Sequence, residues 1–388
     1  MTHVATLLGE KSHALRKLRV PCLRCQDLQA IPPPMQRLAV LVVLAVLCGR
    51  AGADDVPPAA PDAGSAVLPT PAAAAATAGG SASPWIDLAP ANVLTNTGDR
   101  DGKHPIAAAT TLGAFYAGFS TFGFIAWYQH HKPLSQYKFG GDGWLGLDTY
   151  AAGADKWGHA WSTMAVARMG TEILNSWGGF DRTKSVIVST TLSELLFLSV
   201  EVSDGFYYEF SWSDLAGDTV GALLSIPFQL SPRFDDMFDF RVQYWPSPEY
   251  IHDLTTSGSK DRLNIDDDYN GQTYLLCYHL GSIESLREHK WGTLARFVDV
   301  DFGFETRGYK PTPATGILPA DEHHQNLMLG VSFNAQGFFD WVLDGGHHER
   351  TRKILHGITE VFNVPFASAT VPGLEWSRTP TTEPTNME

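Results

Sequence analysis

Acidic residues and one histidine recur at the ends of apolar helical segments in the middle of the chain. The candidate catalytic groups are Asp155, His159, Glu201, Asp204 and Asp214. Carboxylates and an imidazole that meet at helix ends can bind a divalent metal, or an aspartate can orient the histidine as a general base. We therefore predict that these side chains form one polar cluster.

Helical spacing places two pairs of these residues on shared faces. Asp155 and His159 are four residues apart, as are Asp214 and Asp218, so each pair lies on one side of a helix with ~3.6 residues per turn. These four residues are the weak candidates for metal ligands. Asp204 is expected in the turn between two helices.

A purely structural role, with no catalytic reaction, also explains why these residues stand at helix ends. Asp155 and Asp214 stand near predicted helix N-termini, where a carboxylate accepts hydrogen bonds from free backbone N–H groups. The sequence contains no G-x-S-x-G, H-E-x-x-H, phosphate-loop or dinucleotide motif, so no cofactor is indicated. Helix caps are therefore the favoured interpretation, and a ligand or metal site is the alternative.

Four helical segments are predicted to position these groups. They are expected at residues 106–128, 155–177 and 183–203, and from Ser211 to a point before Pro232. Ser211 and Asp214 match a capping box at the start of the fourth segment. Short connections favour antiparallel neighbours, which predicts a four-helix bundle over residues 101–235.

The first segment is the plausible transmembrane helix of the mature chain. Residues 106–128 carry no charged side chain, and a helix of this length would cross a hydrocarbon layer of ~30 Å. A buried helix of a soluble bundle has the same composition, so both alternatives stay open. In lipid, Glu194 and Glu201 would be functional candidates by default, whereas in a soluble bundle Glu194 would face water.

Period-two alternation marks the C-terminal part. It is clearest at residues 298–305 and 327–333, and it extends to 273–280 and the 358–371 region. Residues 236–376 are therefore expected to form an acidic connector and a small antiparallel sheet. The predicted fold class is α+β: a four-helix, partly membrane-like bundle, then the sheet, then a disordered tail at 377–388.

Three further groups are predicted to lie on the surface. Arg168 and Glu172, four residues apart, are expected to form a solvated ion pair on the helix face away from His159. The histidine pairs at 323–324 and 347–348 are expected in surface loops rather than as metal ligands.

Residues 1–53 are predicted to hold a signal peptide. The residues before it are interpreted as an extension that arises because the start of translation is assigned too far upstream. A positive residue at Arg37, an apolar run at 38–47 and an Ala-Gly-Ala cleavage site at 51–53 have the order of a secretory signal. Residues 54–100, rich in alanine and proline, are then a disordered tether. A signal anchor is the alternative.

Cysteine usage agrees with export. Cys22, Cys25 and Cys48 precede the predicted cleavage site, so Cys277 is the cysteine left in the mature chain and no internal disulfide is expected. Leu47 stands before Cys48, where lipidation normally needs a small residue. Lipidation is therefore the minor interpretation.

The net charge limits the kinds of molecule that the protein is expected to bind. Removing residues 1–53 takes away seven basic and two acidic residues, which brings the formal charge from −14 to −19. An acidic chain without a basic stripe excludes nucleic acid as a partner. A membrane or cell-envelope component is expected instead.

Several short motifs resemble a known family. They are Asp155-Lys156-x-Gly158-His159, Glu201-x-x-Asp204-Gly205-Phe206, Phe210-Ser211-Trp212-x-Asp214, Gly221 and Asp268-Tyr269-Asn270-Gly271-Gln272-Thr273-Tyr274. In this order, over about Pro105 to Glu375, they resemble the YfiM-like family of predicted periplasmic lipoproteins, whose function is unknown. A looser resemblance to VanZ-like membrane proteins departs at Asp218, where that pattern has asparagine. The resemblance implies an envelope location and supplies no activity.

Two functional hypotheses follow. The first is an exported, envelope-associated protein that acts as a structural, lipid-binding or partner-binding module. The alternative is a cell-envelope enzyme, with or without a metal, that uses His159 together with Asp155, Glu201, Asp204 and Asp214. The arrangement of these side chains distinguishes the two.

Overall fold

The computed structural model describes residues 103–141, 143–256, 265–289, 292–309, 323–344 and 349–378. All of them belong to one compact unit, Ala53–Glu388. The predicted signal peptide and tether, the histidine pair at 347–348 and residues 379–388 lie outside the described residues. The tail was predicted to begin at 377, but residues 377 and 378 belong to a strand that ends at Arg378.

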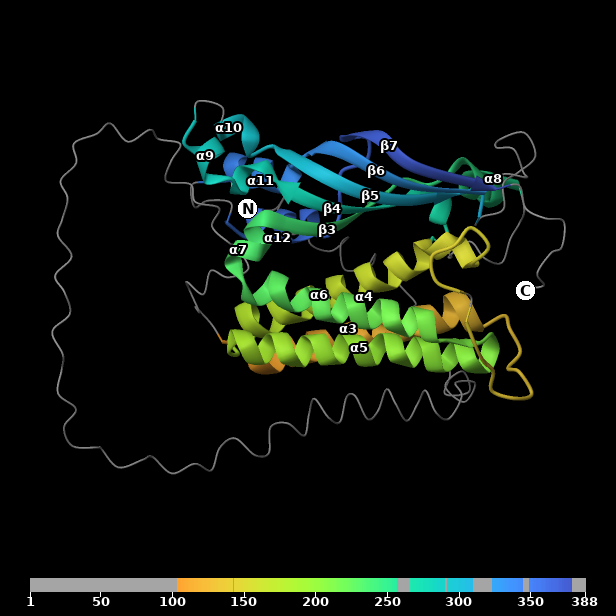
Figure 1. Ribbon diagram of the computed structural model, residues 1–388. Helices are drawn as coiled ribbons and strands as arrows, with labels where there is room; N and C mark the ends of the chain where they lie inside the picture. Colours follow the sequence, from red (N-terminus) through yellow and green to blue (C-terminus); the bar gives the residue numbers. More distant parts are fainter. Residues whose placement is uncertain are drawn as a thin grey trace, which may run out of the picture. The chain divides into compact units, whose positions relative to one another are not determined.

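Four long helices form the first part of this unit, as predicted (Figure 1). They are α3 (Pro105–Gly123), α4 (Ala154–Glu172), α5 (Arg182–Tyr207) and α6 (Trp212–Leu230); α3 continues into the π-helical turn η3 (Phe124–Tyr128), and α4 into η5 (Ile173–Trp177). Helix α4 packs against α5 and α6, α5 packs against α6, and α3 contacts α5 and η5. The three central helices are therefore in mutual contact.

Side-chain caps fix the starts of two helices. Asp181 accepts a hydrogen bond from the Lys184 N–H at 3.1 Å at the start of α5. Ser211 accepts one from the Asp214 N–H at 3.3 Å at the start of α6, which is one half of the predicted capping box; the Ser211 N–H donates to Glu201 rather than to the Asp214 side chain. After η5, Gly179 takes a φ of 72°, the left-handed conformation that commonly ends a helix.

Two glycines bring α6 close to α4. A Cβ at Gly221 would lie 2.1 Å from the carbonyl oxygen of Ala160, and a Cβ at Gly217 would lie 2.9 Å from that of Lys156. Both neighbours are backbone atoms, so no side-chain rearrangement would make room for a methyl group. Small residues four apart allow this approach, as they do between helices in lipid.

A strained turn precedes α4. Ala151 and Ala152 both have a φ of 48° and Gly153 has a φ of 82°, so three consecutive residues are left-handed. This conformation is unfavourable for alanine and persists where the surroundings enforce it. Gln325 donates a hydrogen bond to the Ala152 carbonyl at 2.9 Å, which ties the start of α4 to the sheet.

A five-stranded antiparallel sheet follows the bundle in the chain (Figure 1). Its strands run in sequence order: β3 (Phe238–Tyr244), β4 (Gln272–His279), β5 (Val298–Arg307), β6 (His323–Phe333) and β7 (Ser368–Arg378). The predicted α+β class is confirmed. Two short strands, β1 (Phe139–Gly140) and β2 (Phe210–Ser211), form a separate parallel pair.

The C-terminal part contains elements that the sequence did not predict. Strand β3 lies where a connector was expected; its alternate residues Asp239 and Arg241 are buried charges, which hide the usual strand pattern. The 358–371 region was expected to be extended, but it includes the end of helix α12. The remaining elements are η4 (Tyr150–Gly153), α7 (Pro232–Met237), α8 (Pro248–Thr256), η6 (Tyr269–Gly271), η7 (Leu280–Ser282), α9 (Glu284–Arg287), α10 (Gly292–Ala295), α11 (Ala335–Val342) and α12 (Glu349–Thr359).

The bundle and the sheet share one apolar core, and α4 supplies the bundle side of it. Met164 packs in the same buried cluster as Phe240 and Phe304 of the sheet. The Trp157 ring lies 6.0 Å from the Phe240 ring and 5.9 Å from the Phe304 ring, measured between centroids. Helix α4 is thus in contact with both parts of the fold.

Within the described ranges, one helix is long and apolar enough to cross a membrane. It is α5, by length and composition alone, and half of its most apolar stretch is buried inside the fold. The segment 106–128, which the sequence analysis named as the plausible transmembrane helix, forms α3 and η3 and does not meet the same test of length and hydropathy.

Candidate functional site

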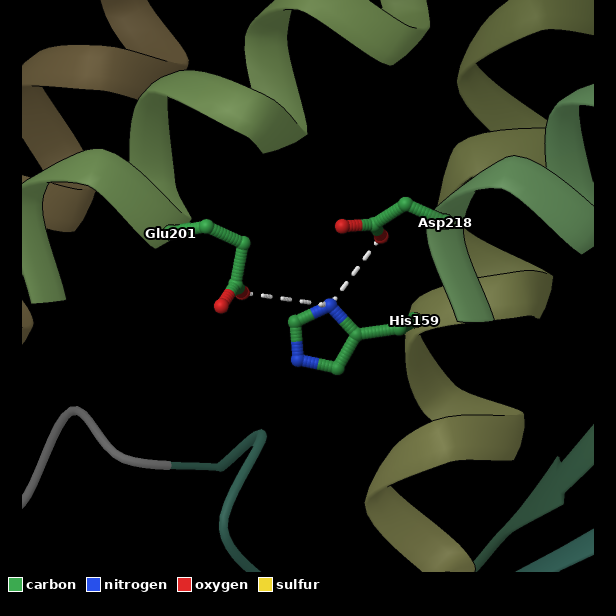
Figure 2. A group of neighbouring side chains, drawn as sticks. All are labelled: His159, Glu201 and Asp218. Carbon is green, nitrogen blue, oxygen red and sulfur yellow. Dashed lines mark hydrogen bonds and ion pairs between the residues drawn. The ribbon is translucent and has the colours of Figure 1, made fainter. Parts of the chain in front are cut away.

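Three of the predicted site residues converge in the bundle. His159 of α4, Glu201 of α5 and Asp218 of α6 point toward one another (Figure 2), and one potential ligand atom from each lies within 4.8 Å of the others. The His159 Nδ1 lies 3.0 Å from Asp218 Oδ1 and 3.8 Å from Glu201 Oε1. Both carboxylates are almost fully buried, and the His159 side chain is 22% exposed. We call these three residues the His159 cluster.

Hydrogen bonds hold one oxygen of each carboxylate. Thr163, one turn after His159 on α4, donates to Asp218 Oδ1 at 2.9 Å, and the Ser211 N–H donates to Glu201 Oε2 at 3.3 Å. The other oxygens, Asp218 Oδ2 and Glu201 Oε1, are buried with no hydrogen-bond partner among the residues the structure describes. A buried polar atom without a partner costs about 1–3 kcal/mol, so a proton or a cation at this point would be stabilising.

Electrostatics favour protons in the cluster when no cation is bound. Burial by itself would lower the pKa of His159, but the carboxylates of Asp218 and Asp214 raise it well above 6.5. Burial raises the pKa of Glu201 to about 9, although the charge of His159 opposes this shift. Both shifts favour the protonated imidazole and the protonated Glu201 carboxyl group. The His159 Nε2 points away from both carboxylates (Figure 2).

Asp204 lies beside the cluster. It belongs to the last turn of α5 rather than to a turn between helices, and the Tyr128 hydroxyl donates to it at 2.8 Å. Burial raises the pKa of Asp204 to about 7.

Asp266, from the loop before η6, accepts a hydrogen bond from Trp127 at 2.7 Å, and burial raises its pKa to about 6. The charge of His159 acts on both carboxyl groups. The sequence signal for Asp266 is the run of three aspartates at 266–268.

Asp155 and Asp214 meet at Lys156, a partner that the sequence analysis did not consider. The Lys156 Nζ lies 2.5 Å from an oxygen of each aspartate, and both Lys156 and Asp155 are buried. The capping position of α4 is occupied by Gly153, and that of α6 by Ser211. The two carboxylates therefore take part in a buried ion triple next to the His159 cluster.

Arg168 is buried, which corrects the prediction of a solvated pair with Glu172. It is 3% exposed, and its guanidinium lies 2.9 Å from Asp235 and 3.0 Å from Glu360. Glu172 pairs with Arg182 instead. Burying a guanidinium requires carboxylate partners, and here they come from α7 and from the residue that follows α12. Spacing along one helix cannot reveal partners so distant in sequence.

The histidine pair at 323–324 also differs from its prediction. Both residues belong to β6 and are partly buried. The His323 ring stacks on Tyr309 with centroids 4.1 Å apart, so this histidine packs on the sheet instead of lying in a surface loop.

One family model matches the chain, and its match contains the whole site. Residues 141–229 match the family described as Predicted periplasmic lipoprotein (DUF2279). This range covers α4, α5 and nearly all of α6, and it holds all six predicted site residues. The description gives an exported, envelope-associated location, as the sequence analysis predicted, and names no activity.

The match is shorter than the resemblance inferred from the motifs, because the Asp268 to Tyr274 motif and the sheet lie outside it. No curated protein and no solved structure matches the chain.

Proposed function

We propose that this envelope protein binds a divalent cation through His159, Glu201 and Asp218. The observation that supports the proposal is the convergence of three ligand-type side chains from three helices. Two of them present buried carboxylate oxygens that lack hydrogen-bond donors. A cation bound at this point would cross-link α4, α5 and α6.

The donor set indicates the class of ion. One imidazole and two carboxylates suit Zn²⁺, Mn²⁺ or Fe²⁺ better than Ca²⁺, which prefers oxygen ligands throughout. Ligand atoms bonded at about 2.0–2.1 Å to a tetrahedral ion lie about 3.4 Å apart, so ligand atoms that are now up to 4.8 Å apart would have to approach by roughly 1.4 Å on binding. Thr163 and the Ser211 N–H would keep the carboxylates oriented, as outer partners do in metal sites.

A binding or structural role is the first function that we propose, with a membrane or cell-envelope component as the partner. An ion-dependent hydrolytic enzyme is the second, favoured by the 22% exposure of His159, which gives solvent access to a site with three protein ligands. Catalytic zinc sites have three protein ligands and keep one position for water. In the enzyme, Asp204 would accept a proton, because its pKa of about 7 suits that task.

Metal titration of the chain starting at Asp54 tests the proposal. We expect Zn²⁺ or Mn²⁺ to bind one site by calorimetry and to raise the melting temperature, by an amount equivalent to about 2.7 kcal/mol at one hundred times Kd. Asp218→Asn and Glu201→Gln should abolish binding. Glu194→Gln is the matched control, because Glu194 is on the same helix and bonds to Thr219 at 2.8 Å outside the cluster. A Glu201→Gln variant that binds as tightly as the parent would refute the site.

The two functions separate in a second assay. The ion-loaded parent is tested for hydrolysis of phosphate esters and carboxylic esters, with Asp204→Asn as the comparison. An enzyme should lose turnover in this variant while it keeps ion binding. A structural module shows no turnover in either protein.

A further inference from the structure

The five-stranded sheet buries its polar face and leaves part of its apolar face exposed. Asp239, Arg241, Asp299 and Asp301, which point to one side, are at most 1% exposed. Six apolar residues that point to the other side are exposed: Leu276 (41%), Val300 (38%), Phe302 (47%), Leu329 (59%), Val331 (49%) and Phe333 (38%). An antiparallel sheet with one face in water has the reverse arrangement.

Strand register places the exposed residues side by side. Leu276 of β4, Phe302 of β5 and Leu329 of β6 are direct partners in one row, and Val300 and Val331 are partners in the next. We call the six exposed residues the apolar sheet face. The adjoining row on the same side contains Tyr274, Phe304 and Leu327, which pack in the core against α4. The apolar sheet face therefore begins where the cover from the bundle ends.

The polar face is held inward by its own partners. Arg241 donates to Asp299 at 2.8 Å and to Asp239 at 2.6 Å, and His279 lies 2.7 Å and 3.1 Å from the same two carboxylates. Gln336 of α11 accepts a hydrogen bond from Arg241 at 2.8 Å. Separating these buried charges would be strongly unfavourable. The orientation of the sheet is thus fixed, and its apolar side is the side left for an external contact.

We propose that the apolar sheet face rests on the lipid surface of the envelope membrane. Sheets that contact lipid place apolar residues on the lipid side and polar residues on the inner side. The family description gives the protein an envelope location. Lipid accepts any apolar surface without shape complementarity, so a face of aliphatic and phenylalanine side chains is sufficient.

The size of the face favours lipid over a second copy of the chain. Six such side chains, 38–59% exposed, offer roughly 500–600 Å² of apolar surface, the upper end of the largest patch on typical monomers. A stable protein interface buries about 800 Å² on each partner, so this face alone is too small for a dimer.

We expect the sheet to lie on the membrane surface without entering the hydrocarbon layer, and to be held there by apolar contacts rather than by charge. In the described part of the chain, β7 ends the sheet and pairs on one side alone, and an open edge is not tolerated within the hydrocarbon layer. The formal charge of −19 that remains without residues 1–53 repels anionic lipids, so apolar binding should not weaken as salt is added.

Vesicle flotation of the chain starting at Asp54, which lies in the compact unit Ala53–Glu388, tests the proposal. The vesicles contain equal parts of phosphatidylethanolamine and phosphatidylglycerol, at low and at high salt. We expect the parent to float in both. Leu329→Ser should lower partitioning about tenfold, whereas Leu329→Ile should retain it. Leu223→Ser is the matched control, since Leu223 is 61% exposed on α6, and it should float like the parent.

Three results would overturn the lipid contact. The first is a parent that does not float, and the second is equal loss in Leu223→Ser and Leu329→Ser, which would place the contact elsewhere. The third is a dimer in sedimentation velocity that Leu329→Ser dissociates while flotation is unchanged. If Leu329→Ser lowers the melting temperature, the nearly isosteric Val331→Thr replaces it, with a smaller loss expected.

Discussion

Replacing Gly221 with alanine should disrupt the contact that assembles the His159 cluster. The new Cβ would lie 2.1 Å from the Ala160 carbonyl oxygen and 2.7 Å from its carbon, where ordinary contact begins at 3.4 Å. Because both atoms belong to the backbone of α4, α6 must move away by about 1 Å, a shift of the kind that overpacking forces. Asp218 is on the moving helix and His159 is on the other.

The magnitude follows from two opposing effects. Overpacking costs about 1–3 kcal/mol, and the better helix propensity of alanine returns about 0.5–1 kcal/mol, so we expect a net loss of about 0.5–2 kcal/mol. The 3.0 Å separation between His159 Nδ1 and Asp218 Oδ1 would grow beyond hydrogen-bond range. Ligand distances in metal sites tolerate changes of about 0.2 Å, so ion affinity should fall at least tenfold.

Denaturant unfolding and metal titration of the same samples measure both effects. Gly113→Ala on α3 is the control, since no atom lies within 4 Å of its new Cβ. The control should gain about 0.5–1 kcal/mol and bind the ion like the parent. A Gly221→Ala variant with the stability and affinity of the parent would show that the close approach of α4 and α6 does not position the cluster.

Two further predictions concern buried charges. Burial lowers the pKa of His279 and of His356, but nearby carboxylates raise these values to about 9 and about 10, above the 6.5 of the unfolded chain. Their contribution to stability is complete below 6.5 and is lost as the pH rises through 9 and 10, so thermal melts should show a falling melting temperature from neutral to alkaline pH; a rise would contradict the assignment. Lys156→Met should cost about 3–5 kcal/mol in denaturant unfolding, because two aspartates lose their buried partner. Lys138→Met, whose side chain is 60% exposed, should cost less than about 0.5 kcal/mol, and similar losses in the two variants would exclude the ion triple.

The helices could be predicted because their signals are local. Apolar runs, the capping serine at 211 and the glycines at 178–179 fix where the helices begin and end, and each predicted segment corresponds to an observed helix. The spacing of Asp214 and Asp218 correctly put them on one helix. It could not show that Asp214 pairs with Lys156 while Asp218 pairs with His159, because that choice depends on how α6 packs against α4.

The sequence does contain a signal for that packing. Gly217 and Gly221 are four residues apart and flank Asp218, and such a pair predicts close helix contact. No local signal of this kind predicts the charged partners of Arg168, because Asp235 and Glu360 lie 67 and 192 positions away along the chain. Only the folded chain brings these residues together.

The strands were found by alternation, but alternation does not say which face is buried. In β5 the valines and phenylalanines alternate with Asp299 and Asp301, and a soluble sheet would turn these aspartates outward. Asp299 is buried because Arg241 and His279 face it from β3 and β4, and Asp301 lies on the same side of the strand, opposite Cys277. Cross-strand partners, which the sequence of one strand does not contain, decided the orientation.

The His159 cluster has to be neutralised in some way, and this requirement connects its proton chemistry with the proposed ion. Two buried carboxylates beside one imidazole are strongly unfavourable when all are deprotonated, which is why burial raises the pKa of Glu201 to about 9. A divalent cation supplies the same two positive charges as the protons on His159 and Glu201. Ion and protons therefore compete for one site, so ion affinity must rise with pH while the stability of the ion-free protein falls. A purely structural cluster would keep its protons in the presence of any ion, and the helix spacing set by Gly217 and Gly221 would then serve packing alone.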